Sequence, residues 1–231
     1  MPRRTTNAAA SAGERRKVDL ELVVGRAHYD ALLMKTLARA HVSVWIATAN
    51  VKGLRVEAPI GTRARARGRY VSVLDLFDDL HKRGVELRLL HAGVPSAAFR
   101  ADLAAHPTLA KGGLAMRRCP RVHLKMIAVD GAALYLGSAN FTGAGLGAKS
   151  DRRRNFEVGV LTDDDVLLDS MQSLFDRIWR GTECARCAVR PLCPKPLDTL
   201  GKPAAKRAAP RAHDDGAARV PKPRPRVARS T

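Results

Sequence analysis

Short apolar runs alternate along the chain with segments whose apolar residues recur at helical spacing. The segment HYDALLMKTLARA, from His28, predicts a helix, and VSVWIATA, from Val42, predicts a buried strand. A second pair follows, in which VSVLDLFDDLHKRG predicts a helix that stops at a glycine and VELRLLHA predicts a strand. Helices that alternate with short buried strands indicate an α/β fold.

The second half of the chain continues this pattern. SAAFRADLAAH predicts a further helix, FEVGVLT a strand, and DDVLLDSMQSLFDRIWRG a closing helix. Between them, RVHLKMIAVDGAALYLGS predicts two strands joined by a hairpin turn at Asp130 and Gly131. The sequence contains no internal repeat.

A length of 231 residues suits one full-sized domain with tails. We expect a basic disordered tail over residues 1–18, the folded domain over 19–180, a cysteine-containing segment packed on it over 181–198, and a disordered basic tail rich in Pro, Ala and Arg over 199–231. The apolar runs are shorter than the roughly 20 residues of a membrane span, and the first residues lack the apolar core of a secretory signal. A cytoplasmic protein without a transmembrane segment is therefore expected.

The formal net charge of +19 favours a polyanionic partner, either nucleic acid or anionic lipid headgroups. A solvated, arginine-rich surface with no partner is the alternative. The stretch GTRARARGRY predicts a flexible loop that contacts phosphates, or else an ordinary solvated charge run. Its four basic residues are Arg63, Arg65, Arg67 and Arg69. Aromatic residues make up only 4% of the chain, which argues against base stacking.

The stretch CPRVHLKMIAVDGAALYLGSANFTG, from Cys119, combines core aliphatics with polar residues at fixed spacing. Alternate side chains of a strand share a face, so His123 and Lys125 project together. Ser138 and Asn140 are again two residues apart, directly after Gly137. A returning hairpin brings these groups together, and a nucleophile with several donors suits phosphoryl transfer.

This stretch resembles the signature of the phospholipase D superfamily, His-x-Lys-x4-Asp-x6-Gly-Ser-x-Asn, which it matches without a gap. The resemblance covers roughly Val23 to Trp179. It implies a phospholipase D-like α-β-α sandwich with a mixed central sheet and one motif per chain. The matching residues are His123, Lys125, Asp130, Gly137, Ser138 and Asn140, and Glu157 in NFEVGV takes the place of the acid on the family's next strand.

The resemblance also implies a role for each residue. His123 attacks phosphorus to form a phosphohistidine, Lys125 and Asn140 hold the non-bridging oxygens, and Ser138 assists. Glu157 orients the imidazole through its other nitrogen, whereas Asp130 is mainly structural. No cofactor is needed for catalysis. Family active sites use two such motifs, so a chain with one resembles the bacterial members that form a two-fold dimer, and we expect a homodimer.

These inferences predict a phosphodiesterase that acts on DNA or RNA, in the manner of the dimeric bacterial endonucleases of the family. One alternative is a phospholipase D or phosphatidyl transferase acting on lipid headgroups, which would use the same catalytic residues. The other is a nucleic-acid-binding module without turnover, against which the complete motif argues.

Four cysteines follow a spacing typical of metal sites. Cys184, Cys187 and Cys193 lie in CARCAVRPLC, and Cys119 lies four residues before His123. Two disulfides are unlikely to persist in a reducing compartment, whereas four thiolates suit either a structural zinc ion or an iron–sulfur cluster. Four free thiols without a joint role are the remaining alternative. We expect a structural site that joins the C-terminal segment to the start of the catalytic strand.

Overall fold

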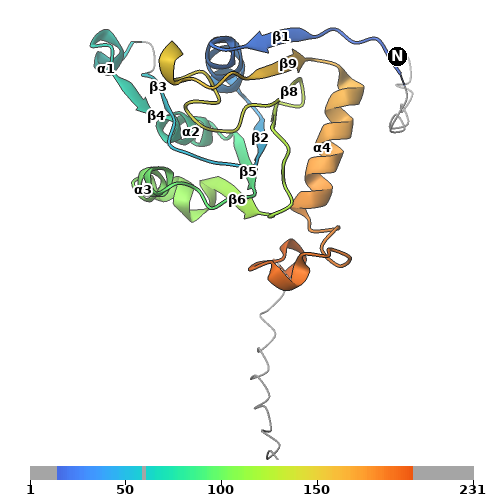
Figure 1. Cartoon of the computed structure of the whole chain (residues 1–231). Coiled ribbons are helices and arrows are strands. Elements are labelled where there is room, and N and C mark those ends of the chain that lie inside the picture. The colour runs from blue at the N-terminus through green and yellow to red at the C-terminus, as the bar shows by residue number, and fades with distance from the viewer. Residues whose placement is uncertain (1–14, 59–60, 200–231) are drawn as a thin grey trace, which may run out of the picture. The chain divides into compact units, whose positions relative to one another are not determined.

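A seven-stranded mixed sheet forms the centre of the protein (Figure 1). The structure, a computed structural model, describes residues 15–58 and 61–199. The predicted tails, 1–18 and 199–231, therefore lie outside the described residues except at 15–18 and 199. The strand order is β1-β9-β8-β7-β2-β5-β6, in which β2, β5 and β6 run parallel and the other neighbours antiparallel.

The strands of this sheet are short, and β2 joins the antiparallel part of the sheet, through β7, to its parallel part, through β5. Their bounds are β1 (Glu21–Val24), β2 (Ser43–Thr48), β5 (Glu86–His91), β6 (Leu114–Arg118), β7 (Met126–Val129), β8 (Ala133–Gly137) and β9 (Val158–Thr162). β3 (Arg55–Glu57) and β4 (Tyr70–Ser72) form a separate antiparallel pair, and the short helix α1 (Arg63–Ala66) lies between them in the sequence. The remaining helices are η1 (His28–Thr36), η2 (Leu37–Arg39), α2 (Val73–Lys82), α3 (Ala97–Ala104), η3 (Leu109–Gly113), η4 (Asp151–Arg153), α4 (Asp165–Trp179), η5 (Arg190–Leu192) and η6 (Leu197–Thr199).

One face of the sheet is covered by η1 and α2. Ser72 begins α2 with a capping box, because its hydroxyl accepts from the Leu74 N–H while Asp75 accepts from the Ser72 N–H at 2.8 Å. Phe77 and Leu80 then point to the sheet at helical spacing and are fully buried. They share one apolar core with η1 and with the strands β2, β5 and β7.

The opposite face is covered by α4 (Figure 1). Asp164 caps this helix by accepting from the Leu167 N–H at 2.8 Å. Phe175 stacks between Trp45 of β2 and Trp179, with ring centroids 5.2 and 5.5 Å apart. Helices on both faces of a mixed sheet confirm the predicted α-β-α sandwich.

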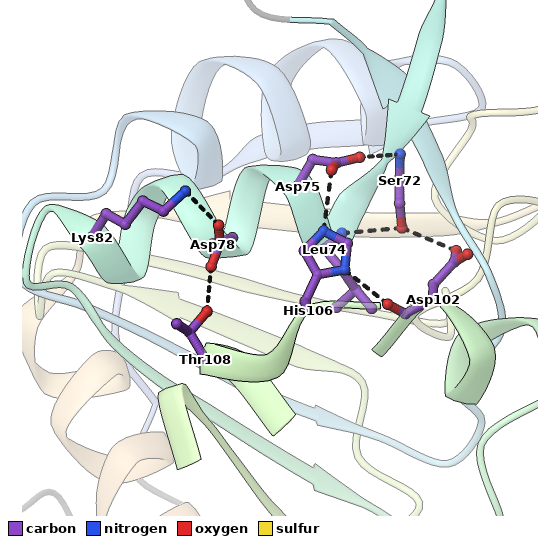
Figure 2. A network of polar contacts seen from close by, with 8 residues as sticks. All are labelled: Ser72, Leu74, Asp75, Asp78, Lys82, Asp102, His106 and Thr108. Atoms are coloured by element: carbon purple, nitrogen blue, oxygen red, sulfur yellow. Dashed lines mark hydrogen bonds and ion pairs between the residues drawn. The ribbon is translucent and has the colours of Figure 1, made fainter. Parts of the chain in front are cut away.

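Polar contacts tie α2 to the neighbouring helices α3 and η3 (Figure 2). His106, after α3, lies 3.1 Å from the Asp75 carboxylate through Nε2 and 2.7 Å from the Asp102 carbonyl through Nδ1. Thr108 donates to Asp78 at 2.6 Å, and Asp78 also pairs with Lys82. This network fixes the layer of helices beside the sheet.

The helices and strands predicted from the pattern are all present, and several elements were missed. The four-residue β1 and the partly basic β6 carry too few apolar residues to stand out. The hairpin turn at Asp130 and Gly131 is confirmed, because both residues have positive φ, 57° and 63°. The strand after Cys119 starts only at Met126, so His123 and Lys125 lie before it, on a segment without regular secondary structure. In the described part of the chain, every helix is too short or too polar to span a membrane.

Candidate active site

Most of the predicted catalytic residues gather at one edge of the sheet. β7 begins there beside the end of β2, with Met126 opposite Ala47, and β8 ends there with Leu136 opposite Met126. β9 begins at the same edge, where Gly159 pairs with Gly137. The segments before β7, after β8 and before β9 therefore meet, although up to 34 positions of sequence separate His123 from Glu157.

His123 and Lys125 form a direct pair at this edge. The Lys125 Nζ lies 3.1 Å from His123 Nδ1, 3.2 Å from Nε2 and 2.9 Å from the His123 carbonyl oxygen. The imidazole is exposed, so a ligand can reach it, and the amine beside it supplies positive charge. The Gly137 N–H donates to the Lys125 carbonyl at 3.2 Å and joins this pair to the end of β8.

Ser138 and Glu157 are joined by a hydrogen bond from the serine hydroxyl to the carboxylate. The other carboxylate oxygen accepts from the Asn155 side chain at 3.0 Å, and the Val158 N–H donates to the Ser138 hydroxyl at 3.1 Å. Both oxygens of Glu157 are thus engaged with these side chains. The predicted contact between Glu157 and the His123 imidazole is not among the hydrogen bonds of the described residues.

Asn140 is held by two residues that sequence reasoning missed. Its Oδ1 accepts from the Asn50 N–H at 3.1 Å and lies 3.3 Å from the Thr48 hydroxyl, whose one proton it shares with the Asn50 carbonyl at 3.0 Å. Thr48 also accepts from the Phe141 N–H at 3.0 Å and is 1% exposed. Because the Asn140 oxygen is occupied, its amide N–H groups are left as donors for a ligand. A polar Thr48 at the end of an apolar strand was the signal that could have indicated this.

A buried pair, His28 and Tyr135, lies beneath the catalytic segment after β8. The His28 Nε2 is 2.9 Å from the Tyr135 hydroxyl, and the Ala139 backbone amide also interacts with that oxygen. Burial raises the pKa of Tyr135 to about 12 and lowers the pKa of His28. A Cβ at Gly159 would lie within 2.7 Å of three atoms of the Tyr135 side chain, so glycine is required where this side chain crosses β9.

Asp130 lies at the opposite edge of the sheet and belongs to the scaffold. Its carboxylate accepts from the backbone N–H groups of His41, Val42 and Ser43 at 2.7–3.1 Å. Burial alone would raise the pKa of Asp130, but these three hydrogen bonds outweigh it and hold the pKa below its ordinary value. Asp130 therefore lies apart from the other motif residues, a position that suits the mainly structural role expected of it.

The arginine stretch forms part of α1 and its flanks, outside the group of catalytic residues. Arg65 pairs with Glu57 of β3, and the Thr62 hydroxyl caps α1 by accepting from the Arg65 N–H at 3.1 Å. Arg63, Arg67 and Arg69 are exposed. The predicted flexible loop is thus partly helical, and the role of the arginines in phosphate binding stays a prediction.

The four cysteines line one small cavity of about 20 Å³, although Cys119 lies 65 or more positions before the other three. All four thiols are free and partly buried. Burial raises the pKa of Cys119; burial would also raise the pKa of Cys187, but Arg121 and backbone N–H groups outweigh it and lower that pKa. Among residues 15–58 and 61–199, no group of three or more His, Cys, Asp or Glu side chains stands ready to hold a metal ion.

Comparison with known proteins gives relatives of this chain. The mitochondrial cardiolipin hydrolase of Xenopus tropicalis is 31% identical over 104 residues, which are 44% of this chain and 45% of that protein. The chain thus matches less than half the length of this curated relative. Among solved structures, Nuc of Salmonella typhimurium, a phospholipase D family member, is 20% identical, with 71% of this chain and 95% of that chain covered and a TM-score of 0.48. NucT from Helicobacter pylori is 18% identical, with 70% and 95% covered and a TM-score of 0.46.

The sequence matches a known family over a region that includes all of the candidate catalytic residues. The family described as "Cardiolipin synthase, PLD-like domain" matches residues 33–179, which include the His123–Lys125 pair, the segment after β8 and Glu157. Since this match spans more than half of the chain and all of the residues that meet at the sheet edge, the protein belongs to the phospholipase D superfamily.

Proposed function

We propose that the protein is a phosphodiesterase that hydrolyses phosphodiester bonds of nucleic acid through a phosphohistidine. The observation that carries this proposal is the exposed imidazole of His123 with the Lys125 amine 3.1 Å away, at the same sheet edge as Asn140 and Ser138. A nucleophile beside fixed donors is what phosphoryl transfer requires, because the developing charge lies on the non-bridging oxygens.

In the first step, an unprotonated ring nitrogen of His123 attacks phosphorus, the P–N bond forms, and the P–O bond to the leaving group breaks. Lys125 and the Asn140 amide donate to the non-bridging oxygens. In the second step, water attacks phosphorus and gives its proton to the group that protonated the leaving oxygen, the P–N bond breaks, and the imidazole is released. Ser138 donates its one hydroxyl proton to Glu157 and accepts from the Val158 N–H, so it would have to turn from Glu157 before it could donate to a phosphate oxygen.

The leaving oxygen needs a proton in the first step. One chain has a single histidine in a His-x-Lys motif, His123, and this residue already acts as the nucleophile. We assign this role to the equivalent histidine of a second copy in a two-fold dimer. An exposed apolar surface supports the assignment, because it lies beside the catalytic residues. It is formed by residues of β1 and its start, by the first residue of β9, and by the residue before Glu157. We name it the β1–β9 patch; its members are Leu20, Leu22, Val24, Phe156 and Val158, all at least half exposed. Burial of such a patch against a second copy would remove apolar area from water.

The β1–β9 patch is continuous with the catalytic residues. Val24, Phe156 and Val158 line a hollow of about 470 Å³ together with Glu157. A second copy seated on the patch would therefore close over the site rather than at a distance from it.

Nucleic acid is supported as the substrate by the net charge of +19 and by the exposed arginines around α1. A lipid phosphodiester is the second candidate, because the β1–β9 patch borders the site and the curated relative is named a cardiolipin hydrolase. Both substrates present the same phosphodiester to the same residues.

The test compares wild type, His123→Ala and His41→Ala on labelled single- and double-stranded DNA, RNA, and vesicles of cardiolipin or phosphatidylcholine. His41 is exposed and its backbone contacts Asp130 at the far edge of the sheet, so His41→Ala is the matched control. We expect cleavage of nucleic acid that falls by about a thousandfold or more in His123→Ala and is unchanged in His41→Ala. Cleavage of lipid and not of nucleic acid would identify the protein as a lipid phosphodiesterase, the second candidate. Activity of His123→Ala within about tenfold of wild type would refute the phosphohistidine mechanism.

A further inference from the structure

The four cysteines converge from two distant parts of the fold on one cavity. Cys119 follows β6, and the other three lie in the turns after α4. The cavity of about 20 Å³ has room for about one water-sized atom. Its remaining lining combines the apolar residues Pro120, Val189, Pro196 and Leu197 with two arginines, Arg118 and Arg190, whose positive charge suits nearby thiolates.

The backbone presents the thiols from both sides of this cavity. After α4, successive turns place Cys184, Cys187 and Cys193 around it: the Cys187 N–H donates to the Cys184 carbonyl at 3.3 Å, and the Cys193 N–H donates to the Arg190 carbonyl at 3.1 Å. On the other side, the Cys119 N–H donates to the His91 carbonyl at 2.9 Å, which fixes Cys119 to the end of β5. The two sides are thus held by their own hydrogen bonds.

The segment after α4 has almost no hydrophobic core of its own. Between Gly181 and Thr199, the one buried side chain is Leu197, which packs into the core beneath α4. Each ordered residue loses conformational entropy, so one buried leucine and the ion pair between Arg190 and Asp198 are too little to order the segment. Small segments of this kind are usually held by disulfides or by a metal, and these four thiols are free.

We propose that Cys119, Cys184, Cys187 and Cys193 bind one thiophilic metal centre that fastens the C-terminal segment to the catalytic domain. Four thiolates are the ligand set of a structural zinc ion, which suits a cavity of about one atom, or of an iron–sulfur cluster, which would have to widen the cavity. As the thiols stand, they are not yet arranged around an ion, so binding requires the cysteine side chains to turn toward the cavity.

The proposed metal centre is linked to the nucleophile His123 through the chain, because Cys119 lies four residues before it. Cys119 and His123 lie on one stretch of chain, and the Arg121 guanidinium between them donates to the Cys187 sulfur at 3.7 Å. Residues 122–125 have no regular secondary structure, and the Val122 N–H donates to the Cys119 carbonyl at 3.0 Å, so the start of this stretch depends in part on what holds Cys119. The centre therefore positions the loop that carries His123, and takes no part in the reaction itself.

The experiment measures metal directly and needs no substrate, so its outcome is independent of the proposed function. The full-length chain is purified without chelator, once in air and once anaerobically, and its zinc and iron contents and visible spectrum are recorded. We expect about one zinc per chain without colour, or two to four irons per chain with broad visible absorbance in the anaerobic preparation. Reactive thiols are counted in the native protein and again after unfolding with chelator, and four should appear only in the second count.

The matched variants are Cys187→Ser, which is nearly isosteric but a poor ligand, and Cys187→His, which offers an imidazole ligand. Zinc should be lost from Cys187→Ser and retained by Cys187→His, whereas an iron–sulfur cluster should be lost from both. Loss of metal should lower the melting temperature by about 5 °C or more. Wild-type protein that contains no metal in either preparation and takes up no added Zn²⁺, or whose cysteines are joined in disulfides, would overturn the proposal.

Discussion

At the scale of single residues, the site depends on side chains that fix the catalytic groups from behind. Asn140 can donate toward a ligand only while its carbonyl oxygen is held by Thr48 and the Asn50 backbone. Ser138 is similarly held by Glu157 and by the Val158 N–H. Such buried or half-buried partners decide the orientation of the donors, and small misplacements of donors are costly in catalysis.

Replacement of Thr48 by valine tests this arrangement, because valine keeps the shape and removes the hydroxyl. The Phe141 N–H would lose its buried acceptor, so we expect a loss of about 1–3 kcal/mol in the free energy of unfolding. Turnover should fall about ten- to hundredfold, because the Asn140 amide loses one of its two anchors. Urea unfolding and single-substrate kinetics measure the two effects. Thr48→Ser keeps the hydroxyl and is the control, and a valine variant that matches it in both measurements would contradict the role assigned to Thr48.

At the scale of elements, the helices beside the sheet are joined by a network that contains a titrating group (Figure 2). Burial alone would lower the pKa of His106, but the Asp102 carbonyl and the Asp75 carboxylate outweigh it and raise the pKa above its ordinary value. Asp78 adds a further negative charge nearby. Protonated His106 therefore holds the end of α3 against the start of α2.

The raised pKa of His106 gives a stabilisation that depends on pH. It is fully present below the ordinary histidine pKa of about 6.5 and is lost as pH rises through the raised value of the folded protein. Burial lowers the pKa values of His28 and His91, so these residues act in the opposite sense and destabilise the fold as pH falls.

Comparison of wild type with His106→Gln isolates the contribution of His106 from that of the other histidines. The difference in the free energy of unfolding should be largest near pH 6 and should shrink toward pH 8, as measured by urea unfolding at each pH. The exposed His41→Gln serves as the control. A difference between wild type and His106→Gln that stays constant over this range would show that His106 acts through packing alone.

At the scale of the whole molecule, the proposed dimer follows from a site that holds one histidine of the required kind and from the β1–β9 patch beside it. The mass in solution should be close to twice 25.0 kDa at micromolar concentration. Phe156 is fully exposed and belongs to the patch, so Phe156→Asp should yield monomers that have lost most of their activity.

Analytical ultracentrifugation measures this change, and Tyr70→Asp is the control because Tyr70 is an exposed aromatic residue of the β3–β4 pair. This variant should remain dimeric and active. A wild-type monomer with full activity would refute the shared site, whereas a dimer that survives Phe156→Asp would place the interface on another surface.

The sequence by itself determined the alternation of helices and strands, the hairpin at Asp130 and the residues of the catalytic motif. These features are local, since apolar periodicity, turn residues and fixed spacing act over a few neighbouring positions. For the same reason the sequence could identify His123, Lys125, Ser138 and Asn140 as one group, because a single hairpin joins them.

Only the tertiary structure decided which residues meet at the edge of the sheet and which do not. Thr48 contacts Asn140 because β2 lies beside β7. Asp130 is not part of the site, because it lies at the opposite end of β7 from His123 and Lys125. The strand register also directed Glu157 toward Ser138 and Asn155, and it brought Cys119 to the three cysteines after α4. Contacts of this kind join positions many residues apart, and their partners are set by packing of the sheet and its two helical layers, which no local pattern of the sequence contains.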